Sequence, residues 1–431
     1  MRLPGRLSAA MVVLADLEAR RRPASESLKD WGNSNRFAGA GDRAAIGNLV
    51  YDALRRRASH AWRMGADTPR ALVLAVAVHD WGETPEAINA AGEGDRFAPE
   101  PITPEEAERA QAPDRLENAP DWVRADVPEW TSASLQRAFG ADWVAQARGF
   151  TDRPPLDLRV NRLKSSRDKV CKALSRFEPQ DAPIAPDGVR MPAGARDSRT
   201  PNVQADEGYI KGWFEVQDAG SQLVSVLAGA EPGQQVLDLC AGAGGKTLAM
   251  AAGMNNRGQI FAFDSERPRL APIYDRLKRN GVRNAQVRPP DPGALDDLTG
   301  RMDLVLVDAP CTGTGTWRRR PDSKWKLGAD QLALRVQQQA GILKEASTFV
   351  KPGGSLVYIT CSVLPEENDE QVTLFLAAHV DFALVDGGQL WSRHFPDHAD
   401  AALVTPMHGL MLTPLQTGTD GFYCARFVRS A

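Results

Sequence analysis

The sequence has few cysteines and none of the close cysteine pairs that bind zinc. Its 431 residues include five cysteines, which are Cys171, Cys240, Cys311, Cys361 and Cys424. They lie far apart, whereas structural zinc sites usually take ligands at short spacings, so we expect no metal site. An odd number of dispersed cysteines in a chain of this length favours free thiols in a reducing compartment.

Long apolar runs are also missing. The longest run, residues 71–78, is much shorter than the roughly 20 residues that cross a bilayer. Residues 11–15 are apolar, but arginines flank them and acidic residues soon follow, which favours an amphipathic helix over a signal peptide. We therefore expect a cytoplasmic protein with no membrane partner.

Neither sign of charge dominates. The 52 Lys and Arg residues and the 55 Asp and Glu residues give a formal net charge of −3, so a nucleic acid would have to bind a local basic patch. Apolar residues make up 42% of the chain and charged residues 25%, which is typical of soluble globular proteins. The length favours two or three domains over a single core.

The N-terminal part, residues 1–91, has the pattern of a helical domain. Apolar residues between Ile46 and Leu54 recur at three- and four-residue spacing, which makes one buried stripe on a helix. Residues 92–127 are rich in proline and acidic residues and show no strand pattern. We expect them to form an acidic linker with a short helix near residues 104–112.

The remainder of the chain has an α/β pattern. Residues 128–215 predict a small α/β module, with a strand at 156–161, a helix at 167–177 and a further extended segment at 188–192. In residues 216–431 the expected strands are 236–240, 260–264, 285–288, 303–308 and 355–361. The expected helices between and after them are 246–254, 268–280, 330–350 and 365–379. Two more strands follow near 382–385 and 421–428. Strands that alternate with helices predict a mostly parallel sheet with helices on both faces.

Two of these strands lead to reactive side chains. One apolar run ends in Asp308, with Cys311 three residues later, and the other leads to Cys361. In open α/β sheets, ligands bind beyond the carboxyl ends of the strands. A lone cysteine at such a place is usually a small buried hydrophobe. Two thiols together with an acid, after a glycine-rich loop, favour a shared catalytic crevice instead.

The glycine-rich loop, residues 238–247, joins the first strand of this domain to its first helix. Its glycines allow a tight turn and a close approach of the backbone to a ligand, and the helix N-terminus offers free N–H groups. The end of the loop and Asp308 also resemble the two Walker motifs of P-loop NTPases. The first Walker glycine is replaced by Cys240, so this alternative is disfavoured but stays open.

Two acids extend the prediction of a nucleoside ligand. Asp264 ends the second strand, where nucleotide-binding folds place a carboxylate on the ribose hydroxyls. A P-loop enzyme does not need this acid, so loop and acid together favour an adenosine ligand such as S-adenosylmethionine. Asp291 follows the third strand and is a candidate acceptor for the adenine amino group, although it could equally be a loop residue between two prolines.

Three motifs resemble the bacterial RNA cytosine-C5 methyltransferases, the family of Sun, Fmu and Nop2-like proteins. They are residues 238–247, residues 308–315 with 318–322, and residues 360–362 with 365–368. The resemblance extends to residues 158–161, 217–222 and 420–423, and residues 42–56 are similar to the NusB-like domain of the ribosomal RNA members. One departure is that Gly242-Ala243 stands where the family usually has Ala-Pro.

The resemblance implies a fold and a cofactor. The fold is a Rossmann-like class I methyltransferase domain, preceded by the small α/β module as an RNA-recognition module and by an N-terminal all-α NusB-like domain that binds RNA. The cofactor is S-adenosylmethionine, and the residues expected to bind it are Cys240, Ala241, Gly242, Ala243, Gly244, Gly245, Lys246, Asp264, Asp291 and Asp308. The implied partner is RNA, 16S ribosomal RNA or an assembling small subunit, and a monomer is expected.

The resemblance also implies catalytic roles. Cys361 is the nucleophile that adds to C6 of cytosine, Asp308 contacts the edge of the base, and Cys311 helps to release the product. Lys246 is expected to add positive charge to the crevice. DNA cytosine-C5 methyltransferases use the cysteine of a Pro-Cys pair, which here would be Cys311, but the Thr-Cys-Ser context of Cys361 is that of the RNA family.

A basic tract follows the Asp308 strand. Arg318, Arg319, Arg320 and Lys324, with Trp325, have the mixture of cations and aromatic rings that suits phosphate contact and base stacking. A solvated loop is the alternative. Residues 365–367 predict the first turn of a helix, with acids at its positive end. Besides the NTPase, the remaining alternatives are a DNA methyltransferase and a non-catalytic RNA-binding or ribosome-assembly factor.

Overall fold

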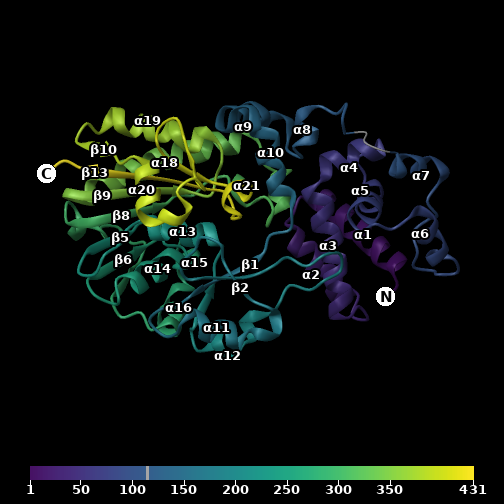
Figure 1. The fold of residues 1–431 in the computed structure, drawn as a ribbon, viewed down its shortest axis with the longest axis horizontal. Helices are drawn as coiled ribbons and strands as arrows, with labels where there is room; N and C mark the ends of the chain where they lie inside the picture. Colours follow the sequence, from purple (N-terminus) through teal and green to yellow (C-terminus); the bar gives the residue numbers. More distant parts are fainter. Residues whose placement is uncertain (113–115) are drawn as a thin grey trace. The chain divides into compact units, whose positions relative to one another are not determined.

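The computed structural model describes residues 1–112 and 116–431, which form two compact units. The first unit consists of Met1–Pro154, Ala193–Thr200 and Trp317–Leu327, and the second of Pro155–Pro192, Pro201–Thr316 and Gly328–Ala431. Figure 1 follows the chain through both units. Within the described residues, no helix is both long enough and apolar enough to span a bilayer.

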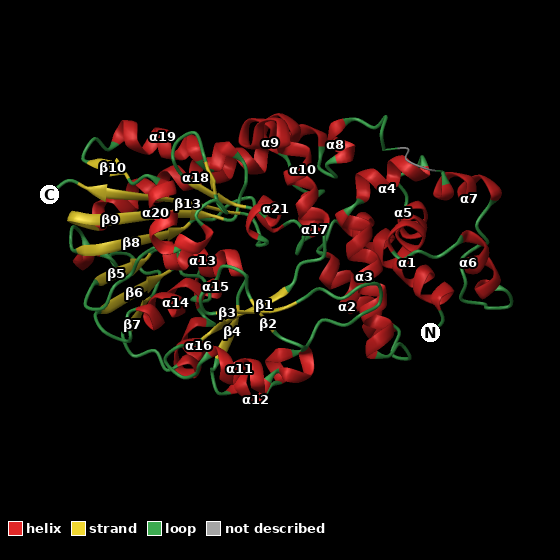
Figure 2. Ribbon diagram, in the orientation of Figure 1, coloured by secondary structure: helices red, strands yellow, loops and turns green. Residues whose placement is uncertain are grey.

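The first unit is helical (Figure 2). Its helices are α1 (Leu3–Arg20), α2 (Ala24–Ser34), α3 (Ala40–Arg55), α4 (Arg57–Met64), α5 (Pro69–Ala75), α6 (Pro85–Gly92), α7 (Pro104–Gln111), α8 (Asp121–Arg124), α9 (Ser132–Phe139), α10 (Trp143–Arg148) and α17 (Pro321–Lys324), with a π-helical turn at Val76–Asp80. The stripe predicted between Ile46 and Leu54 is buried in the core of this unit. The short helix expected near 104–112 is confirmed as α7, which begins with a capping box between Thr103 and Glu106.

Residues 128–154, at the start of the predicted α/β module, are helical and belong to the first unit. They contain α9, α10 and three short 3₁₀ turns, and their apolar side chains Leu135, Trp143 and Phe150 are buried. The strand pattern begins only after Pro155.

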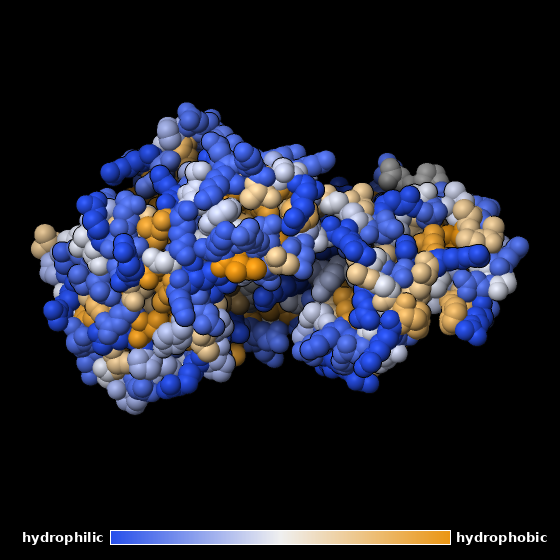
Figure 3. Space-filling view, turned by 90° about the horizontal axis from the view of Figure 1, so that it is seen from below, coloured by the Kyte–Doolittle hydropathy of each residue, from blue (hydrophilic) through white to orange (hydrophobic). Residues whose placement is uncertain are grey.

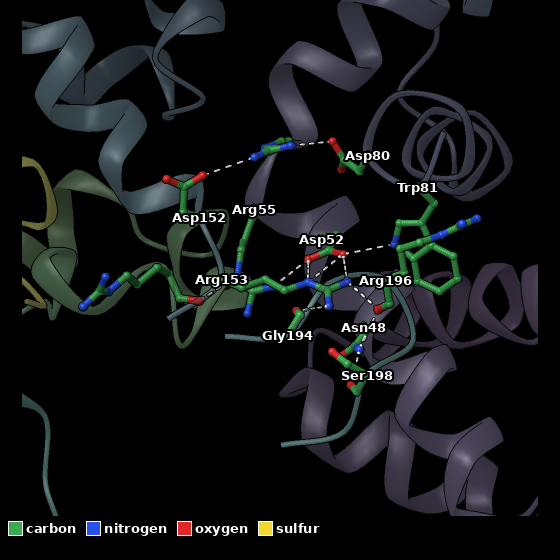
Figure 4. A network of polar contacts seen from close by, with 12 residues as sticks. Asn48, Asp52, Arg55, Asp80, Trp81, Asp152, Arg153, Gly194, Arg196 and Ser198 are labelled. Atoms are coloured by element: carbon green, nitrogen blue, oxygen red, sulfur yellow. Dashed lines mark hydrogen bonds and ion pairs between the residues drawn. The ribbon is translucent and has the colours of Figure 1, made fainter. Parts of the chain in front are cut away.

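A polar network fixes the segment Ala193–Thr200 within the first unit (Figure 4). Asp52 on α3 lies at its centre and accepts hydrogen bonds from Arg55 Nη1 at 2.8 Å and Arg153 Nε at 3.0 Å. Arg153 Nη1 in turn donates to the carbonyl oxygen of Gly194 at 3.0 Å. Asn48 Nδ2, also on α3, donates to the carbonyl of Ser198 at 2.9 Å. Carbonyls of an otherwise irregular segment are thus satisfied by the side chains of Arg153 and of Asn48 on α3.

The second unit begins with a small antiparallel sheet in the order β2-β3-β1-β4. Its strands are β1 (Leu156–Val160), β2 (Gln180–Asp181), β3 (Gly188–Met191) and β4 (Phe214–Val216), with helices α11 (Arg167–Ala173) and α12 (Glu207–Ile210). Leu158, Val160, Val189 and Phe214 form its core with Val170 of α11. The strand at 156–161 and the helix at 167–177 are therefore present, the latter ending as a 3₁₀ turn.

A nine-stranded sheet forms the main body of the second unit, in the order β11-β12-β13-β9-β8-β5-β6-β7, with β10 paired to β13. Its strands are β5 (Gln235–Asp238), β6 (Gln259–Phe263), β7 (Ala285–Arg288), β8 (Met302–Asp308), β9 (Val350–Thr360), β10 (Phe382–Leu384), β11 (Leu403–Val404), β12 (Leu410–Leu412) and β13 (Phe422–Arg429). Strands β5 to β9 are parallel, and β13 is antiparallel to β9. The predicted mostly parallel sheet is confirmed.

Helices cover both faces of this sheet (Figure 2). They are α13 (Ala219–Leu227), α14 (Gly245–Gly253), α15 (Arg267–Leu270), α16 (Ile273–Asn280), α18 (Ala329–Phe349), α19 (Asp369–Ala378), α20 (Gly387–His394) and α21 (Pro414–Thr417). From β5 the sheet grows one way through β6 and β7 and the other way through β8 and β9. The point between β5 and β8 is therefore the topological switch point, where open α/β sheets bind ligands.

The helix predicted at 365–379 is wrong at its start. Pro365–Glu367 form a separate 3₁₀ turn, and α19 begins only at Asp369. Between them Asn368 has φ −118° and ψ −100°, which no helix can accommodate. The side chains of Glu367 and Asn368 bond to the two cysteine loops, as described below, and this removes them from the helix.

The molecular surface seen from below is mostly hydrophilic, with scattered apolar residues (Figure 3). Single exposed apolar residues of this kind are normal for a soluble protein.

Candidate active site

The glycine loop after β5 needs residues without side chains. Gly242 and Gly244 have φ of 49° and 83°, in the left-handed region that favours glycine. A Cβ atom at Gly244 would lie 2.5 Å from Cγ1 of Ile273 on α16. The loop therefore turns tightly into α14, whose first N–H groups face the carboxyl edge of the sheet.

Asp264, directly after β6, holds this loop in place. Its Oδ2 accepts a hydrogen bond from Gly242 N at 2.9 Å, and its Oδ1 accepts one from Glu266 N at 2.9 Å. Nη1 of Arg269 lies 3.6 Å from Oδ2. The structure thus brings together the loop and the acid that the sequence predicted, and it adds Arg269, which sequence reasoning missed.

Asp238, the last residue of β5, is a buried acid that sequence reasoning also missed. Thr247 Oγ1 donates to its Oδ2 at 2.6 Å, while Oδ1 is buried without a hydrogen-bond partner among the described residues. Burial raises the pKa of Asp238 to about 7, because the charged form is poorly solvated there. The sequence signal that could have identified Asp238 is an acidic residue at the last position of the first strand of this domain.

Lys246 and Asp308 form an ion pair at the switch point. Lys246 lies in the first turn of α14, and Asp308 ends β8. The distance between Lys246 Nζ and Asp308 Oδ2 is 2.6 Å, and the lysine is buried, whereas the aspartate is partly exposed. One carboxylate oxygen is thus fixed by a cation while the side chain stays open to a ligand.

The two predicted thiols are in contact. Sγ of Cys311 lies 3.3 Å from Sγ of Cys361. The pKa of Cys311 is raised well above its ordinary value, first by this hydrogen bond and then by burial. The raised pKa favours the thiol form of Cys311, and either sulfur can be the donor of this hydrogen bond.

A backbone contact sets the position of Cys361. Gly315 N donates to the carbonyl of Cys361 at 2.9 Å, and Gly421 N donates to the carbonyl of Gly315 at 2.7 Å. A Cβ atom at Gly315 would lie only 2.2 Å from the carbonyl oxygen of Gly421. The sequence Gly313-Thr314-Gly315 therefore requires glycine at its last position so that three chain segments can meet.

Hydroxyl and amide side chains complete the turn after Cys361. Thr360 Oγ1 donates to Asn368 Oδ1 at 2.6 Å, and Asn368 Nδ2 donates to the carbonyl of Ser362 at 2.9 Å. The Ser362 hydroxyl lies 3.0 Å from that of Thr314. All four side chains are buried, so the turn is rigid where the reactive sulfur emerges.

Glu367 is a further buried acid beside the thiols. Its carboxylate accepts hydrogen bonds from Thr312 N at 2.8 Å, Thr312 Oγ1 at 2.5 Å and Gln339 Nε2 at 2.9 Å. Sequence reasoning placed this acid at the start of a helix; its partners come from the β8 loop and from α18, which a local pattern does not reveal.

Two family models match the chain. Residues 225–428 match the model described as 16S rRNA methyltransferase RsmB/F, and residues 127–195 match the ferredoxin-like domain of RsmF/B-like methyltransferases. The domain formed by residues 225–428 belongs to the RsmB/F methyltransferase family.

Curated relatives and solved structures agree with this placement. The ribosomal RNA small subunit methyltransferase B of Klebsiella pneumoniae is 37% identical over 306 residues, covering 70% of this chain and 66% of that protein. The chain therefore matches just under two thirds of the length of such relatives. A methyltransferase homologue from Pyrococcus horikoshii is 27% identical with a TM-score of 0.58, covering 74% of this chain and 99% of its own. The protein PH0851, 23% identical with a TM-score of 0.72 and 99% coverage of both chains, shares the fold.

The residues of the predicted basic tract differ in their exposure. Arg318 and Lys324, both assigned to the first unit, are buried, with exposed fractions of 4% and 1%. Lys324 Nζ donates to the carbonyls of Arg55 at 2.8 Å and Asp126 at 2.6 Å, and burial lowers the pKa of Lys324 to about 8. Burial argues against phosphate contact by Arg318 and Lys324, whereas Arg320 is exposed and Arg319 partly so, and the RNA-binding role of the tract stays a prediction.

The remaining predicted cofactor residues lie in or near the loop. Cys240 is partly buried, and burial raises its pKa well above the ordinary value, which favours the thiol form. Asp291 is exposed and paired with Arg267, with 2.8 Å between Nη2 and Oδ1, so its role toward adenine stays a prediction. In residues 1–112 and 116–431, no three His, Cys, Asp or Glu side chains are grouped to hold a metal ion.

Proposed function

We propose that this protein transfers a methyl group from S-adenosylmethionine to C5 of a cytosine in RNA, through a covalent bond between Cys361 and the base. The observation that carries the proposal is the contact of Cys311 and Cys361, 3.3 Å between sulfurs, in the domain whose switch point holds the Lys246–Asp308 pair. A methyltransferase acting at an exocyclic nitrogen or at a ribose hydroxyl has no need of a thiol nucleophile.

The residues of the loop fit the proposed cofactor. Gly242 leaves space beside the backbone, where a Cβ atom would meet no described atom closer than 3.7 Å, and Asp264 is fixed by two N–H donors at the end of β6. Its carboxylate has further acceptor capacity for ribose hydroxyls. The left-handed φ of 49° at Gly242 suits glycine, so the departure from the family's Ala-Pro is compatible with the turn. When bound, S-adenosylmethionine supplies an electrophilic methyl group.

Cys361 is the better nucleophile of the two thiols. Because the pKa of Cys311 is raised by its hydrogen bond and burial, Cys311 remains protonated and can donate to a Cys361 thiolate. The thiolate forms a bond to C6 of cytosine, and the ring electrons move to C5, which then attacks the methyl carbon. The C5 proton is lost to a base, the C6–S bond breaks, and the thiolate leaves. We assign Cys311 to this release.

Asp308 and Lys246 serve the base rather than the methyl group. Lys246 fixes one oxygen of Asp308, and the partly exposed carboxylate can accept hydrogen bonds from the amino group and the protonated N3 of the cytosine ring. Charge that develops on the ring during thiolate addition is thereby stabilised by a preorganised group. The target base has to leave its stack to reach these residues.

Small-subunit ribosomal RNA is the proposed substrate, on the basis of the names of the matching family and relatives. The test is transfer of labelled methyl groups from S-adenosylmethionine to 16S ribosomal RNA, to other RNA and to DNA, followed by nucleoside mass spectrometry. We expect 5-methylcytidine in the ribosomal RNA. Label in DNA, in another nucleoside or in no nucleic acid would overturn the proposal. A thermal shift with S-adenosylhomocysteine and none with ATP separates it from an NTPase.

A further inference from the structure

Helix α16 supports the glycine loop of the candidate site with one of its faces. Four of its residues recur at spacings of three and four and so share this face, namely Ile273, Arg276, Leu277 and Asn280. Ile273, Leu277 and Asn280 are buried. A Cβ atom at Gly244 of the loop would lie 2.5 Å from Cγ1 of Ile273. The cation of Arg276 therefore lies on the covered side of the helix, where it needs polar partners.

The guanidinium of Arg276 joins the loop to a segment that is distant in sequence. Its Nη1 donates to the carbonyl of Ala243 at 2.6 Å, and its Nη2 and Nε donate to Oε2 of Glu215 at 2.9 and 3.3 Å. Ala243 lies between Gly242 and Gly244, the two residues of the loop with left-handed φ. A guanidinium holds its donors in a rigid plane, so one side chain can fix both oxygens at once. Arg276 therefore forms a bridge between the middle of the loop and Glu215.

Glu215 is the buried anchor of this bridge. It lies on β4 of the small antiparallel sheet and is 2% exposed. Its Oε1 accepts hydrogen bonds from Arg279 Nη2 and Asn280 Nδ2, both at 2.5 Å. Burial alone would raise the pKa of Glu215, but the charge of Arg276 and these hydrogen bonds outweigh burial and lower that pKa. The carboxylate is therefore charged and fixed at both of its oxygens.

The loop needs such a support because its glycines make it costly to order. Gly242, Gly244 and Gly245 lose more conformational freedom than other residues when the loop takes one shape. Asp264 fixes the N–H of Gly242 at 2.9 Å, but its carboxylate is also the proposed partner of the ribose. A site that is ordered for only part of the time binds its ligand with an affinity reduced by that fraction. Support through a carbonyl leaves the N–H groups at the start of α14 to the ligand.

We propose that Arg276 is a positioning residue, which holds the glycine loop in its cofactor-binding shape by joining the carbonyl of Ala243 to Glu215. The inference rests on the proposed function for the identity of the ligand. It deepens that function, because it makes cofactor affinity depend on the small sheet, in which no residue was predicted to bind the cofactor. Since the loop is ordered once the ligand is bound, loss of Arg276 should weaken binding and leave the chemical step unchanged.

The first experiment measures binding of S-adenosylhomocysteine to the full chain by calorimetry, without RNA. Arg276→Met keeps the apolar stem but has no N–H donor, and it should raise Kd about tenfold because a charged donor to the loop is lost. Arg279→Met is the matched control, since Arg279 lies on the same helix and bonds to the same carboxylate. Among the described residues, the Arg279 side chain donates no hydrogen bond to the loop, so its removal should change Kd little.

Three further variants separate the bridge from a simple effect of charge. Arg276→Lys keeps the cation but can reach only one of the two oxygens, so its Kd should stay well above that of the unchanged protein. Glu215→Gln removes the charge that holds Arg276, so it should raise Kd although Glu215 belongs to another sheet. The double variant Glu215→Gln/Arg276→Met should bind no more weakly than Arg276→Met, because both changes remove the same support.

The order of the loop can also be measured without any ligand. Hydrogen exchange of the peptide covering residues 239–247 should be faster in Arg276→Met than in the unchanged protein or in Arg279→Met. In steady-state kinetics, Arg276→Met should raise KM for S-adenosylmethionine, while kcat at saturating cofactor and KM for RNA stay unchanged. A role in overall stability alone would not produce this separation of KM from kcat.

Three outcomes overturn the inference. The first is an equal Kd for Arg276→Met and Arg279→Met, and the second is unchanged hydrogen exchange of the loop in Arg276→Met. The third is full affinity in Arg276→Lys, because a positive charge without the second contact would then be sufficient.

Failure of the proposed function would look different. An unchanged protein that makes no 5-methylcytidine, yet binds S-adenosylhomocysteine in a way that depends on Arg276, refutes the chemistry and leaves the positioning role standing. A protein that makes 5-methylcytidine with the same KM for S-adenosylmethionine in Arg276→Met and Arg279→Met refutes the positioning role alone. An unchanged protein that binds no S-adenosylhomocysteine refutes both.

Discussion

The carboxylate of Glu367 accepts hydrogen bonds from both the backbone N–H and the hydroxyl of Thr312, at 2.8 and 2.5 Å. Thr312 follows Cys311, and Glu367 lies in the 3₁₀ turn after Cys361. One buried acid thus joins the two loops whose sulfurs are in contact. The distance between the thiols therefore depends on a residue that does not touch the substrate.

Glu367→Gln should lower kcat by about tenfold or more, because an amide cannot accept from both Thr312 donors and Gln339 at once. The negative charge of Glu367 is also among the causes that raise the pKa of Cys311. Its removal should move the pH–rate profile toward acid, which a purely structural loss of active protein would not do. The pH dependence of kcat tests this.

Glu370→Gln is the matched control for that prediction, since Glu370 is an exposed residue of α19. Its profile should coincide with that of the unchanged protein. If kcat of Glu367→Gln were lower at every pH but its pH–rate profile were not shifted, the positioning role of Glu367 would be contradicted.

The two cysteine variants should fail in different ways. Cys361→Ala removes the nucleophile, so methyl transfer and covalent RNA binding should both be abolished. Cys311→Ala keeps the nucleophile but slows release, so a protein–RNA adduct should accumulate. Denaturing gels of reactions with labelled RNA measure the adduct, and an adduct with Cys361→Ala instead would reverse the roles.

Gly315→Ala should destabilise the fold and disturb the Cys361 loop. The added Cβ would lie 2.2 Å from the carbonyl oxygen of Gly421, and backbone cannot yield as a flexible side chain can. We expect a loss of about 2 kcal/mol or more in the free energy of unfolding. Denaturant unfolding measures it, together with the residual activity of the folded fraction.

Gly341→Ala is the corresponding control within a helix. Gly341 lies inside α18, and a Cβ atom there would meet nothing within 4 Å. Alanine should raise the free energy of unfolding by about 0.5–1 kcal/mol, since glycine is the poorer helix former. A stabilising Gly315→Ala, or a strongly destabilising Gly341→Ala, would show that the packing described above is incorrect.

The buried Asp238 should make stability depend on pH. Burial raises its pKa to about 7 in the folded protein, while the unfolded value is near 3.8. Between these values the folded state binds one more proton than the unfolded state, so stability should fall as pH rises from about 4 to about 7. Above about pH 7 Asp238 is ionised in both states, and the loss of stability that it causes no longer increases with pH.

Asp238→Asn should remove this dependence, because an amide has no proton to lose, and its melting temperature should exceed that of the unchanged protein at pH 8. Differential scanning calorimetry from pH 5 to pH 8 makes the comparison. Parallel stability curves for the two proteins across this range would refute a raised pKa for Asp238.

The sequence predicted the centre of the fold better than its edges. Strands β5, β6, β8 and β9 were recognisable because their apolar runs are buried on both faces of a parallel sheet. Strands β11 and β12, of two and three residues, carry no such signal; β12 pairs with the edge of β13, and β11 pairs with β12. Proline and glycine marked the loops, but they could not show that Glu367 and Asn368 leave the helix to bond to distant residues.

For the candidate site, the residues that the sequence predicted share one edge of the sheet, and their chemical roles stay predictions. Asp264, Lys246, Asp308 and the two thiols could be found because each lies just beyond a recognisable strand or at a helix start. The burial of Lys324 could not be predicted, since its carbonyl partners belong to Arg55 and Asp126, far away in the sequence. A local sequence pattern shows which residues are basic, but it does not show which of them are exposed to solvent.

The backbone enters the helical unit three times, in Met1–Pro154, Ala193–Thr200 and Trp317–Leu327. The helical unit is therefore not a contiguous domain that gene fusion could add to a methyltransferase or that a single proteolytic cut could remove. A fragment lacking the first 154 residues would lose the two carbonyl groups, of Arg55 and Asp126, that accept hydrogen bonds from the buried ammonium of Lys324. Exchange of this part between homologous enzymes has to transplant all three segments together.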